Sequence, residues 1–423
     1  MRLSERDQRI LWHPYTQHKT ALPPVAVVRG EGVLLWDEDG KEYIDAIASW
    51  WVNPFGHSNP VIANAIYKQL TTLEHVLFGG FTHAPAVELG EKLLEILPKN
   101  QARIFFSDNG STSVEVAIKT SLQYFYNKGE RRTVLIAFDD AFHGDTFAAM
   151  AASGISLYTQ AFSEMFIEVV RIPVPVAGKE QESLEALQHA LRTKDVAAFI
   201  FEPVIQGAAG MVMYEPAALD TLISACRDAG VLTIADEVMT GFGKTGAWFA
   251  CDLLRQPVDM MCLSKALTGG AIPMAVTTFT QEVFEAFYDE DINKALFHGH
   301  TFTANPAGCA AALAAISLME LPETWSNLSR IALRHREFGH RMSTHPKVAS
   351  TRTRGVVFAL EVRADGPQEY YGTLRNRMYK EFISRGIILR PVANIIYILP
   401  PYIITDEQLA KIYLTIEQVL DVI

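Results

Sequence analysis

The fold is decided by two stretches, Val231-Leu-Thr-Ile-Ala-Asp-Glu-Val238 and Met260-Met-Cys-Leu-Ser-Lys-Ala-Leu-Thr-Gly-Gly270. Each is a short apolar run that leads to a polar residue, Asp236 in the first and Lys265 in the second. Short apolar runs beside glycine-rich loops are typical of buried strands. In a parallel α/β sheet the carboxyl ends of the strands form the ligand crevice. The two side chains, 29 residues apart, are therefore expected to point into one pocket.

A lysine at a buried strand end indicates covalent chemistry. Desolvation lowers the pKa of an amine, which makes it a nucleophile toward carbonyl groups. A lysine that forms a Schiff base, with an aspartate that keeps a pyridinium nitrogen protonated, is the arrangement used with pyridoxal phosphate. The alternative is a structural ion pair between Asp236 and Lys265, since such pairs also occupy strand ends.

The composition is that of a globular chain of two or three domains. Of the 423 residues, 49% are hydrophobic and 20% charged, and domains usually hold roughly 100 to 200 residues. The formal net charge of −11 argues against general nucleic-acid binding, which needs a basic face. The four cysteines lack metal-ligand and disulfide spacing, the N-terminus lacks a signal-peptide core, and no stretch of about 18 apolar residues occurs. We therefore expect a cytoplasmic protein.

Hydrophobic periodicity predicts strands and helices that alternate along most of the chain. Strands are expected within 25–48 and at 103–106, 133–138, 196–202, 231–236, 260–263, 275–280, 355–362, 387–391 and 395–401. Helices are expected at 60–75, 85–97, 111–129, 182–193, 216–229 and 281–289, in a long region over 306–346, up to about 385, and at the end of the chain. Residues 150–180 are expected to be loop-like.

Three parts of the chain are predicted from this order of elements. Residues 51–305 are expected to form a large domain that holds the cofactor. Residues 306–423 are expected to form a smaller α+β domain, and residues 1–50 to pack with it.

A phosphate cradle is predicted where a strand meets a helix, at Ser107-Asp-Asn-Gly-Ser-Thr. Gly110, Ser111 and Thr112 lie at the expected helix N-terminus, where free backbone N–H groups, the helix dipole and two hydroxyls favour an anion. An ordinary helix cap by Ser111 or Thr112 is the alternative. With Lys265 in the same chain, we favour phosphate binding.

Four ring side chains invite a functional interpretation. Phe142 has a flat face that can stack on a ring, whereas His143, a lone histidine beside a glycine, is more often structural. His298 and His300 lie in one loop, but no further ligand is nearby. No metal site is therefore expected.

The ordered motifs resemble the class III (subgroup II) aminotransferases of the pyridoxal phosphate fold type I. The resemblance covers most of the chain and rests on Ser107-Asp-Asn-Gly-Ser-Thr-Ser-Val-Glu-Val-Ala-Ile-Lys, Phe142-His-Gly-Asp-Thr, Glu202-Pro-Val-Ile-Gln-Gly-Ala-Ala-Gly-Met, Ile234-Ala-Asp-Glu-Val-Met-Thr-Gly-Phe-Gly-Lys-Thr-Gly and Leu263-Ser-Lys-Ala-Leu-Thr-Gly-Gly. It implies an α/β fold with a mostly parallel seven-stranded sheet in the large domain, and a smaller α+β domain. It also implies pyridoxal 5′-phosphate as the cofactor and a homodimer with shared active sites.

The resemblance also implies roles for residues around the cofactor. Lys265 carries the cofactor covalently and moves the proton between the substrate carbon and the cofactor, while Asp236 keeps the pyridine nitrogen protonated. Gly110 and Ser111 bind the phosphate, and Thr301 completes the phosphate site from the other subunit. The other implied cofactor residues are Phe142 on the ring, Glu202 and Gln206 near the ring face and its O3′ side, and His300 beside Thr301.

Four stretches outside the cofactor motifs resemble one branch of the class, whose members transfer the amino group of S-adenosylmethionine to 8-amino-7-oxononanoate in biotin synthesis. They are Trp12-His-Pro-Tyr-Thr, Ala48-Ser-Trp-Trp, His75-Val-Leu-Phe-Gly-Gly-Phe-Thr-His, and Leu389-Arg-Pro with Ile396-Tyr-Ile-Leu-Pro-Pro-Tyr-Ile-Ile. The implied substrate site consists of Tyr15, Trp50, Phe142, Gly299, Arg390 and Tyr397, with Asp145 behind the N-terminal segment. Arg390 has the fork that binds a carboxylate, and Trp50 can cover an apolar chain.

Three positions differ from the family pattern and bear on the amino donor. The family commonly has Tyr in place of Phe142, Pro in place of His300 and Arg in place of Lys244, and a lysine lacks the bidentate fork of an arginine. An ω-amino acid:pyruvate aminotransferase is the alternative within the class. A racemase, mutase or decarboxylase with the same cofactor, and a binding protein without catalysis, are the alternatives outside it.

Overall fold

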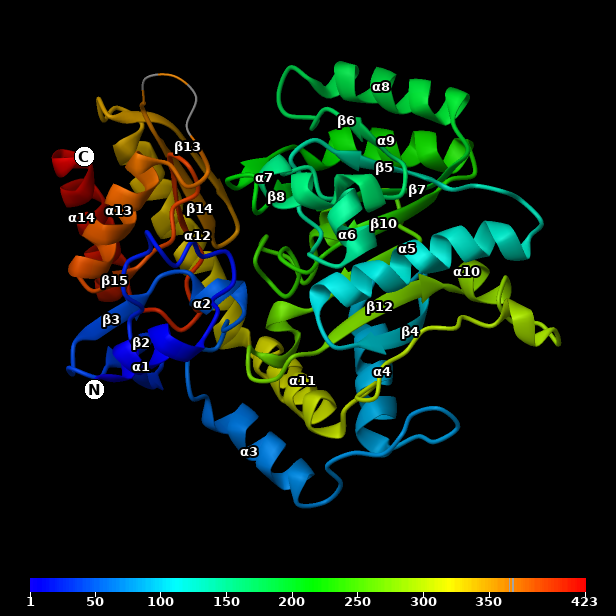
Figure 1. The fold of residues 1–423 in the computed structure, drawn as a ribbon, viewed down its shortest axis with the longest axis horizontal. Coiled ribbons are helices and arrows are strands. Elements are labelled where there is room, and N and C mark those ends of the chain that lie inside the picture. Colours follow the sequence, from blue (N-terminus) through cyan, green and yellow to red (C-terminus); the bar gives the residue numbers. More distant parts are fainter. Residues whose placement is uncertain (365, 367–368) are drawn as a thin grey trace.

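A seven-stranded sheet forms the centre of the structure (Figure 1). The structure is a computed structural model that describes residues 1–364, 366 and 369–423. The strand order is β4-β12-β11-β10-β7-β5-β6; β12 runs antiparallel to both of its neighbours and the other pairs are parallel. The strands are β4 (Gln101–Ser107), β5 (Val134–Phe138), β6 (Val169–Ile172), β7 (Val196–Phe201), β10 (Leu232–Asp236), β11 (Met260–Leu263) and β12 (Ala275–Thr280). The predicted mostly parallel seven-stranded α/β sheet is confirmed.

The two stretches that decide the fold lie side by side in this sheet. Strand β10 pairs in parallel with β11, and Asp236 lies opposite Cys262. Both strands therefore end at the same edge of the sheet, as the parallel arrangement predicts. Successive residues of β10 face opposite cores, because Ile234 and Ala235 belong to different hydrophobic clusters. Burial on both faces explains why the strand sequence is continuously apolar.

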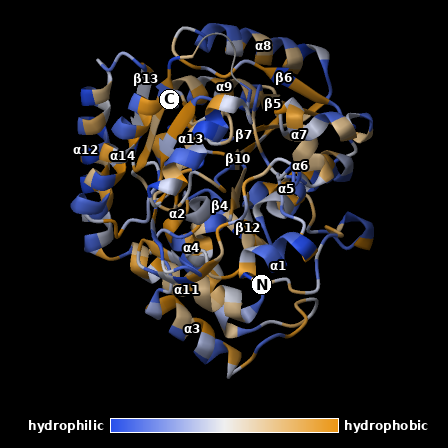
Figure 2. Cartoon of the chain, turned by 60° about the vertical axis from the view of Figure 1, so that its left-hand side comes forward, coloured by the Kyte–Doolittle hydropathy of each residue, from blue (hydrophilic) through white to orange (hydrophobic). Residues whose placement is uncertain are grey.

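Helices cover both faces of the sheet. On one face α5 (Gly110–Asn127) packs across β11, β7 and β10. On the other face lie α4 (Ala84–Ile96), α8 (Glu180–Thr193) and α9 (Pro216–Asp228), which bury apolar side chains such as Leu89, Leu187 and Ile223. Figure 2 shows hydrophobic strands inside, while α8 and α12 present mostly hydrophilic residues outward. This amphipathic pattern is what the helical periodicity predicts.

The N-terminal strands join the C-terminal part of the chain. Strand β15 runs parallel to β3, with Ile387 opposite Ile44, in a four-stranded sheet of order β1-β2-β3-β15. A three-stranded sheet of order β13-β14-β16 lies in the same half of the molecule (Figure 1). The strands are β1 (Val27–Glu31), β2 (Leu34–Asp37), β3 (Glu42–Asp45), β13 (Val348–Arg354), β14 (Val357–Val362), β15 (Ile387–Ile388) and β16 (Ile395–Ile398). The pairing of β3 with β15 supports the predicted packing of residues 1–50 with the small domain.

The C-terminal helices pack on different parts of the structure. Helix α12 packs on β13 and β14, α13 packs on α14, and α11 packs on α3 and α4 beside the large sheet. The helices are α3 (Pro60–Leu70), α11 (Pro306–Met319), α12 (Pro322–Met342), α13 (Thr373–Ser384) and α14 (Asp406–Val422). Helix α11 begins just after the predicted boundary at residue 305, but it contacts helices of the large domain. The boundary therefore stays a prediction.

Short elements complete the fold. They are α1 (Leu3–Ile10), α2 (Ala48–Trp51), α6 (Phe147–Ala152), α7 (Ser156–Thr159), α10 (Gln281–Glu285), β8 (Ile205–Gln206), β9 (Val212–Met213), and 3-10 turns at Gln160–Met165, Ala250–Leu253, Lys265–Thr268 and Ile292–Lys294. Among the described residues, no helix has both the length and the apolar character to cross a membrane.

Several regions differ from the prediction. Residues 150–180, expected to be loop-like, contain α7 and the edge strand β6, of whose four residues the first three are only partly buried, which gives a weak pattern. The expected helical region over 306–346 is divided, because Pro322 begins a new helix and lacks the N–H that would continue the old one. The pattern does not predict β13, whose residues are largely polar and which lies at a sheet edge. The helices expected to end at 75 and 289 end at Leu70 and Glu285.

Candidate active site

One cavity of about 500 Å³ lies at the carboxyl ends of β10 and β11. Its walls come from the N-terminal segment, the strand ends, the start of α5 and the chain between residues 370 and 397. The predicted site residues that line it are Tyr15, Trp50, Gly110, Ser111, Phe142, Asp145, Glu202, Asp236, Lys265, Arg390 and Tyr397. Segments from both ends of the chain therefore meet in one chamber.

Lys265 lines this cavity, and its side chain forms no hydrogen bond or salt bridge with the described residues. Its backbone is left-handed, with φ +48°, which costs a residue other than glycine about 1–3 kcal/mol and is found mostly at functional sites. The amine Nζ lies 4.6 Å from the ring centroid of Trp51 and has no hydrogen bond or salt bridge within the described residues. Burial lowers the pKa of Lys265 to about 8, against the opposing charges of Asp236 and Glu202. A structural ion pair between Lys265 and Asp236 was left open by the sequence analysis. The structure does not contain this ion pair among the residues that it describes.

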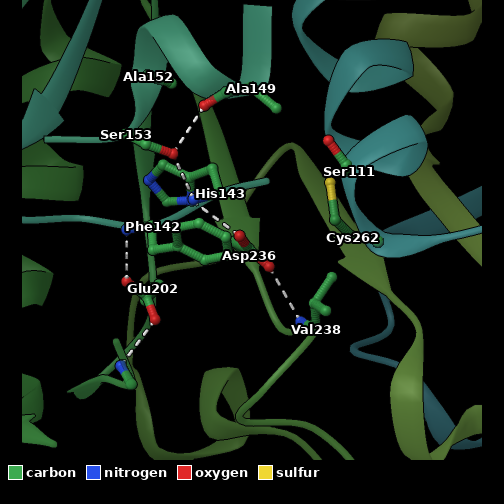
Figure 3. Close-up of polar contacts among 12 residues, drawn as sticks. Ser111, Phe142, His143, Ala149, Ala152, Ser153, Glu202, Asp236, Val238 and Cys262 are labelled. Carbon is green, nitrogen blue, oxygen red and sulfur yellow. Dashed lines mark hydrogen bonds and ion pairs between the residues drawn. The ribbon is translucent and has the colours of Figure 1, made fainter. Parts of the chain in front are cut away.

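Asp236 is held instead by His143 and by the backbone (Figure 3). The Oδ2 atom of Asp236 lies 2.8 Å from Nδ1 of His143, and Oδ1 accepts from the Val238 N–H at 3.0 Å. Because a carboxylate only accepts, His143 donates from Nδ1. The His143 backbone N–H donates to Ser153 Oγ at 2.8 Å, and that hydroxyl donates to the Ala149 carbonyl at 2.9 Å. The buried chain of contacts fixes the direction of the Asp236 carboxylate.

The start of α5 leaves Ser111 free of the capping role. The N-cap is Asn109, whose extended backbone lets its side chain accept from the Thr112 N–H at 3.0 Å. Neither Ser111 nor Thr112 is therefore the N-cap, but Thr112 Oγ1 accepts from the Asn109 N–H at 3.2 Å and completes a capping box. Ser111 Oγ lies 2.7 Å from Thr146 Oγ1 and accepts from the Thr146 N–H at 2.9 Å. A Cβ at Gly110 would lie 2.7 Å from Val238 Cγ1, so this position accommodates glycine alone without a shift.

Glu202 is a buried carboxylate fixed by two backbone donors. Its oxygens accept from the N–H groups of Phe142 at 3.1 Å and Gly207 at 2.8 Å, and Figure 3 shows the bond with Phe142. Burial raises the pKa of Glu202 to about 7, with His143 opposing the shift and Asp236 adding to it. Gln206 donates from Nε2 to the Asp139 carbonyl at 3.0 Å and does not line the cavity in the described structure.

Aromatic residues and an arginine form the far end of the cavity. The Cζ atom of Arg390 lies 4.5 Å from the ring centroid of Trp50, and the ring of Tyr15 meets Trp50 edge-on at 5.8 Å. The Tyr15 hydroxyl donates to the Asp145 carboxylate, and burial, with this carboxylate, raises the pKa of Tyr15. Tyr397 is buried and packs edge-on against Trp51 at 6.0 Å.

Some predicted residues lie outside the cavity of their own chain. Gly299, His300 and Thr301 do not line it in the described structure; their loop is held to α5 by Lys119, whose Nζ donates to the Phe297 carbonyl at 3.2 Å. Lys244 is buried behind the site and donates to the Gly241 carbonyl at 3.1 Å. Burial lowers the pKa of Lys244 to about 7, with Lys265 as the second cause.

A family model described as aminotransferase class-III matches residues 15–420. The chain belongs to the class III aminotransferases. A protein of Synechococcus elongatus named adenosylmethionine-8-amino-7-oxononanoate aminotransferase is 43% identical to this aminotransferase, over 97% of this chain and 98% of that one. A Geobacter sulfurreducens protein of the same name is 36% identical, over 96% of this chain and 94% of that one.

Solved structures share the fold of this aminotransferase. The crystal structure of adenosylmethionine-8-amino-7-oxononanoate aminotransferase from Methanocaldococcus jannaschii gives a TM-score of 0.94 at 32% identity, over 99% of this chain and 98% of that one. An omega transaminase from Pseudomonas jessenii, in complex with PMP, gives a TM-score of 0.92 at 28% identity, over 100% and 98%. The two names match the two substrate hypotheses within the class.

The aminotransferase site contains residues that the sequence analysis did not assign to it. They are Trp51, His143, Tyr158, Tyr370, Tyr371 and Arg375. Trp51 and His143 lie within motifs that the sequence analysis had already selected. Their neighbours in the sequence therefore indicated that these residues could belong to the site. The other four lie in stretches without any motif. Their place in the cavity is set by how distant segments pack.

Proposed function

We propose that this aminotransferase transfers the amino group of S-adenosylmethionine to 8-amino-7-oxononanoate, a step of biotin synthesis, with pyridoxal 5′-phosphate as cofactor. The observation that carries the proposal is the single cavity that joins the unpaired Lys265 to the Trp50–Arg390 pair. The first end suits amino-group transfer, and the second suits an apolar chain that ends in a carboxylate. The names of the relatives support the same substrates.

The residues around Lys265 fit the proposed cofactor. Lys265 offers an amine without a hydrogen bond or salt bridge among the described residues, and Asp236 offers a fixed negative charge. Phe142 offers a flat apolar face, and the helix start at Gly110 and Ser111 offers donors for a phosphate. When bound, pyridoxal phosphate supplies an aldehyde that condenses with amines and a ring that withdraws electrons from the adjacent carbon.

The chain's own residues hold charge and move a proton. Asp236, fixed by two hydrogen bonds, would keep the proton on the ring nitrogen. The Nζ of Lys265, once free, would take the proton from the substrate carbon and return it in the second half of the cycle. A pKa near 8 leaves a useful fraction of this amine neutral at neutral pH, and only the neutral amine accepts a proton.

The far end of the cavity would bind the amino acceptor. Its carboxylate matches the planar fork of Arg390, and its alkyl chain matches the ring of Trp50. Tyr15, held by Asp145, closes the same wall. The sulfonium group of the proposed donor is a cation, and aromatic faces attract cations.

Two substrate pairs test the proposal against the alternative. Purified protein with pyridoxal phosphate should form 7,8-diaminononanoate from S-adenosylmethionine and 8-amino-7-oxononanoate, measured by mass spectrometry. With S-adenosylmethionine alone, the absorbance of the bound cofactor should shift to shorter wavelength. Turnover of an ω-amine with pyruvate, and none with the first pair, would favour the ω-amino acid:pyruvate aminotransferase. Because the chain shares its fold with an omega transaminase, the reaction of an ω-amine with pyruvate is the appropriate control.

The cysteines support a cytoplasmic location, which we also propose. Cys226, Cys251, Cys262 and Cys309 are buried and free. Free cysteines are usual where glutathione and thioredoxin keep thiols reduced.

We further propose a homodimer in which Thr301 reaches the phosphate cradle of the partner subunit. The position of residues 299–301 outside the cavity of their own chain supports this arrangement. Exposed apolar side chains on the same loop, at Phe297 and Phe302, support it further, because such side chains are common in subunit interfaces.

Mixed dimers test the shared site. Neither Lys265→Ala nor Thr301→Asp subunits alone should be active, since Asp would repel the phosphate. Co-expressed, they should recover up to about one quarter of the wild-type activity, because about half of the dimers are mixed and each has one intact site. Two affinity tags allow the mixed dimer to be isolated and its turnover measured. Failure of the mixed dimer to recover activity would place Thr301 in the site of its own chain.

The pH dependence of cofactor uptake tests the pKa of Lys265. The rate at which the apoprotein takes up pyridoxal phosphate should rise about tenfold per pH unit up to about pH 8 and then level off, because only the neutral amine attacks the aldehyde. The rate is measured by stopped-flow absorbance. A Glu202→Gln variant should move the midpoint to lower pH, since Glu202 raises the pKa of Lys265. A rate of cofactor uptake that is constant below pH 8 would contradict the lowered pKa of Lys265.

A further inference from the structure

A second cavity of about 1030 Å³ adjoins the active site. It lies between the N-terminal segment, from Gln8 to Pro24, and helix α13. Tyr15, Tyr371, Arg375 and Arg390 line both this cavity and the active site. These four side chains therefore form the wall that the two cavities share.

The second cavity carries positive charge on a chain that is negative as a whole. Its lining includes Arg375, Arg377, Lys380 and Arg390, and no Asp or Glu among the described residues that line it. The formal net charge of the chain is −11. A cleft lined by charge of one sign concentrates ligands of the other sign. The cavity therefore favours an anionic group.

Arg375 is a buried arginine that has no acidic partner among the residues the structure describes. Its side chain is 9% exposed. Nε donates to the Pro391 carbonyl at 3.2 Å and Nη1 to the Asn376 side chain at 3.0 Å, while Nη2 has no partner among the described residues. The Cζ atom lies 5.2 Å from the ring of Tyr371. The Cζ atom also lies 5.1 Å from the ring of Tyr379. The two rings offset part of the cost of burying a guanidinium without a counter-charge, and a bound anion would remove the remainder.

The position of Arg375 on its helix adds to this cost. It lies in the first turn of α13, where the helix dipole disfavours positive charge. Arg390 also has no salt bridge in the described structure, and its guanidinium rests on Trp50. Burial, and then the charge of Arg390, lower the pKa of Arg375. Two neighbouring arginines that form no salt bridge with any described carboxylate are the arrangement expected of an anion site.

We propose that Arg375 is a second carboxylate-binding residue, which acts with Arg390 on the anionic end of the amino acceptor. The inference rests on the proposed function, because the carboxylate of that acceptor lies at the opposite end of an alkyl chain from the carbon that receives the amine. S-adenosylmethionine carries its carboxylate next to its amino group, and therefore places it at the Lys265 end. Arg375 selects acceptors by their remote carboxylate and leaves the donor unaffected.

Binding of an acid and of its amide to the holoenzyme tests this role. Octanoate and octanamide share one alkyl chain, but only the first has a charge. Arg375→Met should weaken octanoate binding about 10- to 100-fold in isothermal titration calorimetry, because charge-assisted hydrogen bonds are lost, and octanamide binding less than about 3-fold. The KM for 8-amino-7-oxononanoate should rise by a similar factor, while kcat and the KM for S-adenosylmethionine stay within about 3-fold.

Two further variants separate recognition from structure. Arg385→Met removes the same charge from the C-terminal end of α13, outside both cavities, and should leave octanoate binding unchanged. Arg375→Lys keeps the charge without the fork, and should give an intermediate loss.

The outcomes distinguish this inference from the proposed function. An equal loss for octanoate and octanamide in Arg375→Met would mean that Arg375 only positions Pro391, which overturns the inference. Unchanged octanoate binding would overturn it as well, even where the enzyme turns over 8-amino-7-oxononanoate. A selective loss for octanoate supports the inference even where the enzyme does not accept that substrate, a result that would reject the proposed function alone.

Discussion

Lys265→Ala is expected to lower the turnover number at least about 10³-fold, the scale of a lost proton-transfer group combined with a lost nucleophile. The variant should also lose the absorbance of the covalently held cofactor. The reason lies in the surroundings of Nζ, which has Trp51 beside it and no partner in the described residues that could replace it. The amine of Lys244, which is also desolvated, donates to the Gly241 carbonyl and lies outside the cavity lining.

Stability separates loss of chemistry from loss of fold in this variant. Removing a desolvated amine that has no hydrogen bond or salt bridge among the described residues should leave the unfolding temperature unchanged or raise it, because such a charge is a cost to the folded state. Lys194→Ala is the matched control: Lys194 forms an exposed salt bridge with Glu168, and its removal should change neither turnover nor cofactor absorbance. Turnover of Lys265→Ala within tenfold of the wild type would contradict the role of Lys265.

The centre of this site could be predicted because its residues follow strands that carry strong patterns. The apolar runs before Asp236 and Lys265 are buried on both faces of the sheet, which makes them continuous and easy to recognise. Their common edge then follows from the parallel arrangement. Strands β6 and β13 lie at sheet edges, carry mixed polarity and escape the same reasoning.

The rest of the site depends on contacts between distant segments. From the sequence alone, His143 is interpreted as a structural histidine. In the fold, β10 places Asp236, 93 residues away in the sequence, beside its ring. Arg375 belongs to no motif, and reaches the cavity because the turn after β15 places the Pro391 carbonyl against its Nε. The capping role of Asn109 depends on a backbone conformation that the sequence does not determine uniquely. Residue type and spacing alone do not predict these contacts.

Asp236→Asn is expected to lower the turnover number about 10²- to 10³-fold, as loss of a preorganised charge does in other active sites. Asparagine has nearly the same shape, but it carries no charge to hold the proton on the ring nitrogen. Its side chain also offers one acceptor oxygen where the carboxylate offers two, and both donors at this position, His143 Nδ1 and the Val238 N–H, need an acceptor. Steady-state kinetics of the variant with saturating cofactor measures the effect.

A neighbouring aspartate provides the control for burial. Asp259 precedes β11 and lies outside the cavity lining. It accepts from the N–H of Thr233 at 2.8 Å and from its hydroxyl at 2.7 Å, and Thr233 is on the same strand as Asp236. Asp259→Asn should lower the unfolding temperature and leave the turnover of the folded enzyme unchanged, whereas Asp236→Asn should lower the turnover of the folded enzyme whatever its effect on the unfolding temperature. If both variants lose turnover in proportion to stability, Asp236 supports the fold alone. A His143→Asn variant that couples with Asp236→Asn by about 0.5–3 kcal/mol in a double-mutant cycle would show that the two residues act as one unit.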